Sequence, residues 1–210
     1  MISLMILSMS NLLLLFLSYF AGLTLDYFSR FLIEGAFPRW ADSYTFLLSA
    51  VSGVYLYALS IRQAPPLVTL LMCGALIITA ITDIRYLLIS RYMTLALVPA
   101  ALFLRAQGVI PGGILGGLCG AFICGGFLWT MGALFFAKKQ KEGIGQGDVD
   151  LMILIGSYFG LYDAWTILTI ASIGGACITF VLHKGMGRSL EAHIPFGTYI
   201  AGTALLWLLL

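Results

Sequence analysis

The sequence is poor in charged residues, and this scarcity limits the class of protein that it encodes. Asp, Glu, Lys and Arg make up 10% of the 210 residues, whereas 61% are hydrophobic and the mean hydropathy is +1.03. A soluble domain has about 25% charged residues, which cover its surface. The composition therefore excludes an ordinary soluble fold and predicts a membrane protein.

Several patterns that build binding sites are missing as well. The four cysteines lie in apolar stretches and form no CxxC pair, and the two histidines have no metal-ligand spacing, so we predict no metal site. The net charge of +2 is small, and no basic run alternates with aromatic residues, which argues against nucleic acid as a partner. No glycine-rich run ends in Gly-Lys-Ser or Gly-Lys-Thr, so a phosphate-binding loop is excluded.

Long apolar stretches are what the sequence has instead. A helix needs about 20 apolar residues to cross the hydrocarbon core of a membrane. Cutting the chain at charges and Pro/Gly pairs leaves eight stretches of this kind. We therefore predict an all-α, polytopic membrane helix bundle that forms a single membrane-embedded domain over residues 1–210. The expected spans are residues 2–25, 43–61, 65–82, 89–107, 111–137, 149–162, 163–182 and 194–210.

Basic residues are distributed unevenly between the connections of these spans. Cytoplasmic loops retain Lys and Arg, so the odd-numbered connections are predicted to be cytoplasmic and both termini to lie on the periplasmic or outer side. The odd-numbered connections carry Arg30, Arg39, Arg85, Arg91, Lys138, Lys139, Lys141, Lys184 and Arg188, whereas the even-numbered ones carry only Arg62 and Arg105.

Glycine is concentrated in the fifth expected span, residues 111–137. Gly112 with Gly116, and Gly113 with Gly117, form small-xxx-small pairs. Such pairs let helices approach closely inside a membrane. We expect this span to pack tightly against its neighbours.

Two carboxylates stand at span ends on the same predicted side of the membrane. Asp83 follows an apolar run, and Asp148 closes residues 143–148, in which glycines alternate. An acidic residue at a helix centre costs about 2.5–3.5 kcal/mol on insertion, so a carboxylate near a span needs a reason. The structural explanations are an interfacial Asp83 paired with Arg85 or Arg91, and an Asp148 that caps a helix.

The functional explanation is a carboxylate pair that activates water for peptide hydrolysis. Two like charges held together cannot both ionise, which leaves one acid and one base. Helix dipoles favour Asp148, at a helix start, as the carboxylate base and Asp83, at a helix end, as its protonated partner. Asp150 lies about 200° from Asp148 around a helix, so it cannot also face Asp83.

Gly145-Gln146-Gly147-Asp148 resembles the GxGD signature of membrane aspartyl proteases, and the chain from about residue 67 onward resembles the type IV prepilin peptidases. Two further stretches carry this resemblance. They are Thr82-Asp83 followed by Ile89, and Ile194-Pro195-Phe196-Gly197 at the start of the last span. The family has eight spans with outside termini, which agrees with the topology inferred from the charges.

The resemblance implies an aspartyl endopeptidase of the bacterial inner (cytoplasmic) membrane that removes the basic leader peptide from type IV prepilins or pseudopilins. It implies that Asp83 and Asp148 are catalytic and that proteolysis needs no cofactor. The expected partners are the pilin substrate and membrane lipid. The residues expected to bind substrate or to position loops are Gly143, Gly145, Gly147, Asp150, Pro195 and Gly197.

Three features depart from the family pattern. The family usually has proline where this chain has Ser90, and lysine where it has Asp150. Many members also insert a zinc-binding domain with paired cysteines, linked to methylation of the new pilin N-terminus, where this chain has a short cysteine-free cytoplasmic loop, residues 26–42. Proteolysis is therefore the expected activity, and N-methylation with S-adenosylmethionine stays open.

Three other functions remain alternatives from the residues alone. A proton- or cation-coupled small transporter also uses membrane carboxylates, although near the midplane. A protease of the signal-peptide-peptidase or presenilin type shares GxGD but has a Pro-Ala-Leu sequence, which this chain lacks. A catalytically silent assembly protein for a pilus is the third, and an assay of pilin cleavage distinguishes it from an enzyme.

Overall fold

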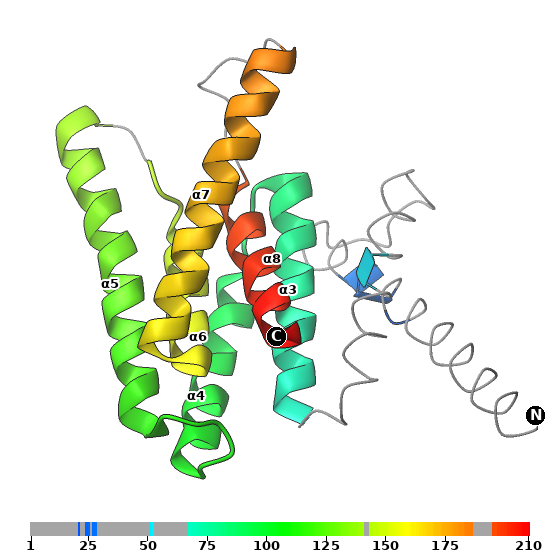
Figure 1. Cartoon of the computed structure of the whole chain (residues 1–210), viewed down its shortest axis with the longest axis vertical. Coiled ribbons are helices and arrows are strands. Elements are labelled where there is room, and N and C mark those ends of the chain that lie inside the picture. The colour runs from blue at the N-terminus through cyan, green and yellow to red at the C-terminus, as the bar shows by residue number, and fades with distance from the viewer. Residues whose placement is uncertain are drawn as a thin grey trace, which may run out of the picture. The chain divides into compact units, whose positions relative to one another are not determined.

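The computed structural model describes residues 67–140, 143–186 and 195–210, together with positions 21, 24, 25, 27, 28, 51 and 52 in the first third of the chain. Every regular element within these residues is an α-helix (Figure 1), which confirms the all-α prediction for this part of the chain. The helices are α3 (Leu67–Tyr86), α4 (Arg91–Ala106), α5 (Gly113–Lys139), α6 (Gln146–Phe159), α7 (Leu161–Met186) and α8 (Phe196–Leu209).

These helices follow the expected spans, with shifts at their ends. The expected spans 2–25 and 43–61 and the loop 26–42 lie outside the described residues, apart from the isolated positions given above. The sixth helix begins at Gln146, ahead of the expected start at residue 149, and ends at Phe159. It ends there because Gly160 has a φ of 86°, a left-handed backbone that glycine adopts without strain. This single residue joins α6 to α7.

Three of the described helices are long and apolar enough to cross a membrane, over residues 69–86, 113–139 and 161–181. The last helix, α8, is apolar but shorter. Large apolar side chains such as Phe122 and Trp129 stand exposed on α5. Exposed apolar side chains of this kind are suited to lipid rather than to water. The helices thus support a membrane protein, while the count of eight spans and the side of the termini stay predictions.

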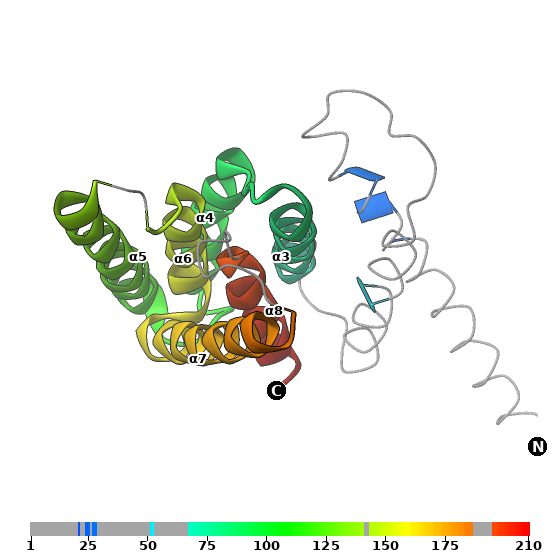
Figure 2. The ribbon, with the colours of Figure 1, turned by 90° about the horizontal axis from the view of Figure 1, so that it is seen from above.

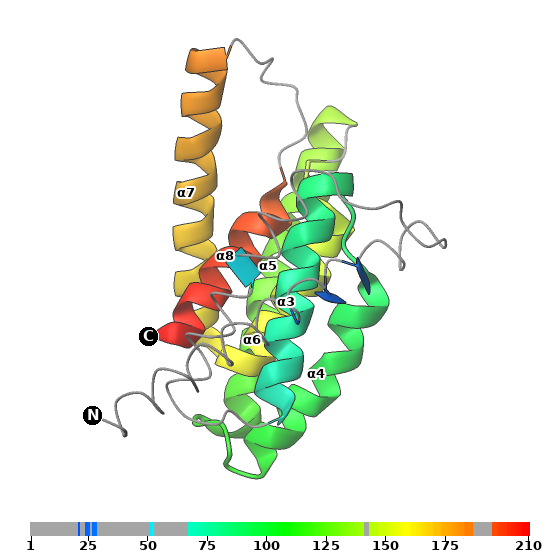
Figure 3. The same ribbon diagram turned by 90° about the vertical axis from the view of Figure 1, so that its right-hand side faces the viewer.

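The helix α6 is central to the second of two compact units into which the chain divides. The first unit comprises residues 1–81 and 209, and the second comprises residues 82–208 and 210. In the second unit, α6 packs against α4, α5 and α7 (Figure 2). The last helix, α8, lies beside α7, where a Cβ added to Gly175 would come within 3.0 Å of the Tyr199 ring (Figure 3).

Small residues allow α5 and α6 to touch backbone to backbone. A Cβ on Gly120 would collide with the backbone of Gly156, and a Cβ on Gly156 would collide with that of Gly120. A Cβ on Gly117 would lie 2.7 Å from the carbonyl oxygen of Ser157, whereas Gly113 has nothing within 4 Å. The predicted tight packing of this span is confirmed, and it runs through Gly117 and Gly120.

The contacts between α5 and α6 also define their direction. Gly125 of α5 meets Ile153, and Gly132 meets Ile144, which precedes α6. As residue numbers rise along α5, those of its partners fall, so the two helices are antiparallel. The start of α6 therefore lies beside the second half of α5, well before α5 ends at Lys139.

Buried Arg105 of α4 caps the C-terminal end of α6. Its Nε donates a hydrogen bond to the carbonyl oxygen of Tyr158 at 3.0 Å, and its Nη1 donates one to that of Gly113 at 3.3 Å. A cation is favoured at the C-terminus of a helix. A Cβ on Gly112 or Gly116 would approach Nη1 at 2.9 Å or 3.2 Å. This glycine pair therefore makes room for the guanidinium rather than for another helix.

Candidate active site

Two aspartates border one small space where the last turn of α3 meets the first turns of α6 and α8. Asp83 lies in the last turn of α3 and Asp148 in the first turn of α6, and their exposed fractions are 5% and 9%. A Cβ added to Gly197 of α8 would lie 3.2 Å from Asp83 Oδ2 and 3.0 Å from Asp148 Oδ1. The fold thus brings together two carboxylates that are far apart in the sequence, as the sequence-based hypothesis requires.

Asp83 accepts two hydrogen bonds from Thr198, a residue with no marked signal in the sequence. The backbone N–H of Thr198 lies 2.6 Å from Asp83 Oδ2, and its hydroxyl oxygen lies 2.9 Å from the same atom. This N–H belongs to the first turn of α8, where backbone amides have no partner in their own helix. Asp83 therefore caps α8, and the positive end of that helix favours the ionised carboxylate.

Asp148 has different surroundings, although it is buried to a similar degree. It precedes the apolar run of α6 and lies outside the three helices long enough to cross a membrane. Burial raises the pKa of Asp148 to about 7, and the nearby charge of Asp83 acts in the same direction. The backbone N–H of Gly145 opposes this rise in part. Asp148 therefore keeps its proton up to near-neutral pH.

Ile89 fits into the gap that two glycines leave beside the aspartates. It lies in the short connection between α3 and α4. A Cβ on Gly147 would come 2.7 Å from the Ile89 Cβ, and a Cβ on Gly197 would collide with the Ile89 Cδ1. Glycine at both positions is thus needed for the connection to pack against α6 and α8.

The other expected site residues flank the pair at the helix starts. Gly145 is the N-cap residue of α6, and Pro195 is that of α8. Gly143 lies further away, against α5, where a Cβ would collide with the ring of Phe135. The structure therefore brings Gly145 beside Asp148, whereas Gly143 fixes the preceding segment to α5.

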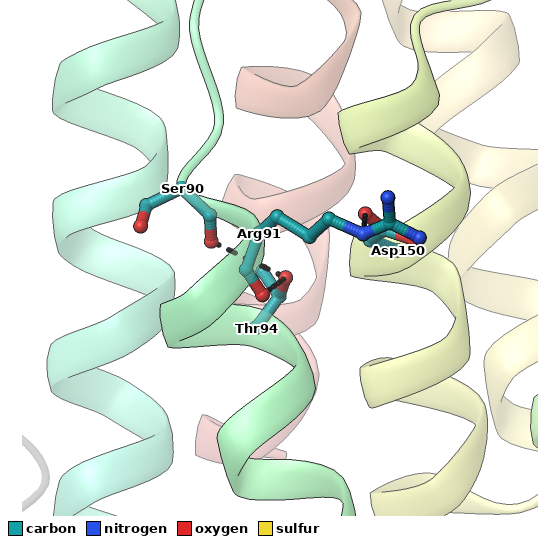
Figure 4. Close-up of polar contacts among 4 residues, drawn as sticks. All are labelled: Ser90, Arg91, Thr94 and Asp150. Atoms are coloured by element: carbon teal, nitrogen blue, oxygen red, sulfur yellow. Dashed lines mark hydrogen bonds and ion pairs between the residues drawn. The ribbon is translucent and has the colours of Figure 1, made fainter.

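Asp150 faces away from the pair, as the angle between helix positions predicts. Its Oδ2 lies 3.1 Å from Nε of Arg91 at the start of α4, and Figure 4 shows this side chain reaching from α4 to α6. Arg91 therefore pairs with Asp150, and not with Asp83. Ser90, where the family usually has proline, is the N-cap residue of α4, and its carbonyl oxygen accepts a hydrogen bond from the Thr94 hydroxyl.

The site thus pairs Asp83, which accepts two hydrogen bonds, with Asp148, which keeps its proton up to near-neutral pH. Both side chains reach the same small space, and a pair of carboxyl groups that shares one proton supplies an acid and a base. A water molecule held there would be activated by the base while the acid polarises a carbonyl group. The arrangement is suited to hydrolysis without a covalent intermediate.

Known proteins resemble this chain over the part that holds both aspartates. Residues 70–180 match the type IV leader peptidase family. A protein of Aeromonas hydrophila named "Prepilin leader peptidase/N-methyltransferase" is 28% identical over 170 residues, which cover 77% of this chain and 56% of that protein. A protein of the same name from Burkholderia pseudomallei strain 1026b is 28% identical over 133 residues, or 62% of this chain and 42% of that protein.

A third relative, also named "Prepilin leader peptidase/N-methyltransferase", comes from Xanthomonas campestris pv. campestris. It is 38% identical over 74 residues, which cover 35% of this chain and 26% of that protein. The chain thus spans between about a quarter and just over half of the length of these relatives. No solved structure matches it significantly.

Proposed function

The chain belongs to the type IV leader peptidase family, and we propose that it is a membrane aspartyl endopeptidase that removes the basic leader peptide from type IV prepilins or pseudopilins. The facing pair of buried carboxylates, Asp83 and Asp148, is the observation that carries this proposal. The names of the relatives supply the substrate class. In this proposal the chain is a multi-pass protein of the bacterial inner membrane and cuts its substrate at the cytoplasmic face.

In the proposed reaction Asp83 is the base and Asp148 the acid. Water attacks the scissile carbonyl carbon while the Asp83 carboxylate takes one of its protons and Asp148 protonates the carbonyl oxygen. The tetrahedral diol then collapses: its C–N bond breaks, the amine takes the proton held by Asp83, and Asp148 recovers its proton from a hydroxyl. The two hydrogen bonds from Thr198 support Asp83 as the charged partner.

This assignment reverses the one that the dipoles of α3 and α6 predict. Asp83 stands at the C-terminal end of α3, which disfavours its charge. The first turn of α8 points two donors at the same carboxylate, which opposes that effect and supports this assignment. We further propose that Gly145 helps to position an extended peptide beside Asp148, because glycine leaves the main chain open to close approach, whereas Gly147 and Gly197 position the Ile89 connection.

Methyl transfer is the second activity in the names of the relatives. The proposed hydrolysis consumes only water, so S-adenosylmethionine would be a co-substrate of this second reaction alone. The loop 26–42 contains no cysteine, and so it lacks the thiolates of a structural zinc site. We therefore propose proteolysis as the function of this chain and treat methyl transfer as a separate arm of the test.

The test is cleavage of a purified prepilin by the purified chain in detergent. Mass spectrometry of the pilin shows whether the leader has been removed, and parallel reactions with S-adenosylmethionine show whether a methyl group is added. We expect wild-type protein to cleave, and Asp83→Asn and Asp148→Asn to lose activity by several orders of magnitude. Asp163→Asn, a change in the first turn of α7, is the matched control and should keep full activity.

Cleavage by either Asp83→Asn or Asp148→Asn would remove the two-aspartate mechanism. A wild-type protein that cleaves none of several prepilins would remove the peptidase function itself. In that case ion uptake into vesicles would test the transporter alternative. That alternative has less support, since Asp83 lies at the end of α3 rather than at its middle.

A further inference from the structure

Asp150 lies two residues after Asp148 but contacts a different helix. Its side chain is 3% exposed, and its Oδ2 lies 3.1 Å from Nε of Arg91, whose side chain is 63% exposed (Figure 4). No hydrogen bond from the described residues reaches this oxygen. The contact is therefore an attraction between charges rather than an aligned hydrogen bond.

Neither residue is well placed without the other. Arg91 opens α4, where the positive end of the helix dipole repels a cation. Asp150 is buried, and a buried carboxylate is strongly disfavoured unless a cation compensates its charge. The ion pair offsets both costs. It also gives Asp150, at a position where the family usually has lysine, a partner of opposite charge.

Each residue of the ion pair lies two positions along the chain from a residue at the aspartate site. Arg91 follows Ile89 by two residues, and Ile89 fills the space beside Gly147 and Gly197. Asp150 follows Asp148 by two residues in the same helix. A link between Arg91 and Asp150 therefore fixes the Ile89 connection against the first turns of α6.

We propose that Arg91 is a positioning residue, which through Asp150 holds the Ile89 connection against α6 and keeps Asp148 opposite Asp83. This inference rests on the peptidase function proposed above. Without the Arg91 charge, the buried Asp150 carboxylate must take up a proton, draw in water or separate α4 from α6, and each of these changes the contact between the two helices. A displacement of about 1 Å at a reacting group lowers a rate by about a hundredfold.

A double-mutant cycle tests the ion pair, with kcat and KM measured for prepilin cleavage. Arg91→Gln should lower kcat about tenfold to a hundredfold with little change in KM. Asp150→Asn should keep most of the activity, because it removes the buried charge together with its need for a partner. The double variant should recover to the level of Asp150→Asn. Arg91→Lys retains the cation, and it should keep most of the wild-type kcat.

Lys138→Gln is the matched control, because it removes one positive charge from an exposed site on α5 and should leave kcat unchanged. Wild-type kcat in Arg91→Gln would overturn the inference. So would equal losses from Arg91→Gln in the wild-type and Asp150→Asn backgrounds. An Arg91→Gln protein that fails to fold supports the ion pair if Asp150→Asn restores folding, and overturns it if not.

The same proteins distinguish this inference from the peptidase proposal. Wild-type protein that cleaves no prepilin contradicts the proposed function. If the wild-type protein is active but the effects of Arg91→Gln and Asp150→Asn are independent of one another, only the ion-pair inference is contradicted. The thermal unfolding midpoints of all four proteins in the cycle measure the coupling between Arg91 and Asp150 without any substrate. Additive midpoints together with additive kcat values would show that the two side chains do not act through one another.

Discussion

Single residues give the two aspartates different surroundings. Asp83 and Asp148 are the same chemical group, and both are buried at the end of a helix. Asp83 receives two hydrogen bonds from Thr198, which lies 115 residues further along the chain. Asp148 is held mainly by burial, which keeps it protonated. The proposed division into base and acid therefore rests on neighbours that only the fold brings together.

The proton on Asp148 predicts how cleavage depends on pH. Because the pKa of Asp148 is raised to about 7, we expect kcat/KM to fall as the pH rises through about 7 and the acid is lost. Steady-state rates between pH 5 and about 9 measure this alkaline limb. A rate that stays constant up to about pH 9 would contradict the role of Asp148 as the acid.

The same pKa predicts an effect on stability that needs no substrate. Folding favours the protonated form of Asp148, so the free energy of unfolding should fall as the pH rises from 3.8 to about 7. Asp148→Asn stays neutral and should remove most of this fall, which amounts to a few kcal/mol at about 1.4 kcal/mol per pKa unit. Thermal unfolding of both proteins at pH 4 and about pH 8 measures the difference.

The Thr198 hydroxyl supports the charge on Asp83, so its removal should slow cleavage. A hydrogen bond to a charged group contributes about 1.5–3 kcal/mol, and we expect Thr198→Val to lower kcat at least about tenfold. Thr198→Ser keeps the hydroxyl and is the matched control, with kcat close to wild type. Equal rates for the valine and serine variants would show that the backbone N–H alone supports Asp83.

Gly197 occupies a position where a single methyl group reaches both aspartates. In Gly197→Ala the new Cβ would meet Asp83, Asp148 and Ile89 at once. We expect cleavage to fall about a hundredfold through displacement of the carboxylates. Gly202→Ala in the same helix is the control, because nothing lies within 4 Å of its Cβ. Loss of activity in both variants would indicate a general effect on α8 instead.

The sequence predicts the aspartate pair but not the residues that surround it. Asp83 and Asp148 each stand beside a long apolar run, so their place at helix ends follows from the pattern of hydrophobic residues. Thr198 gives no comparable signal, because a threonine in the first turn of a helix usually serves that helix alone. Arg91 was one of two candidate partners for an interfacial Asp83, and the register of α4 against α6 gives it Asp150 instead.

At the level of helices, the fold depends on how closely α5 and α6 approach. Gly120→Ala would place a Cβ into the backbone of Gly156, and forcing atoms into a packed contact costs about 1–3 kcal/mol. We expect this variant to unfold at lower temperature than wild type in detergent. Gly126→Ala has open space around its Cβ and should be neutral or slightly stabilising, because alanine favours helix.

The sequence predicts which helices exist better than it predicts where they begin and end. The expected spans correspond to α3 to α8 in the right order, because each apolar run is longer than an apolar stretch in a loop. The alternating glycines ahead of Asp148 resemble a loop in composition, yet α6 already begins at Gln146. Gly147 belongs to the helix because Ile89 occupies the space of its missing side chain. That constraint comes from tertiary packing, which propensity does not contain.

For the whole molecule, the arrangement of charges predicts that the two ends of α5 lie on opposite sides of the membrane. This helix of 27 residues is about 40 Å long, which exceeds the hydrocarbon core of about 30 Å. In a protein whose four native cysteines are replaced by alanine, Gln107→Cys should react with an impermeant maleimide added outside cells. Lys139→Cys should react only after the cells are opened, and the opposite pattern would invert the predicted topology.

The antiparallel register of α5 and α6 determines how water reaches the aspartates. Ile144, just ahead of α6, meets α5 at Gly132, seven residues or about 10 Å before Lys139. If the lysines at the end of α5 sit among lipid headgroups, Ile144 lies about 10 Å beneath them and Asp148 lies deeper still. The proposed hydrolysis consumes water, so it requires a hydrated path from the cytoplasmic face down to this depth. The supply of water along that path then becomes part of each turnover.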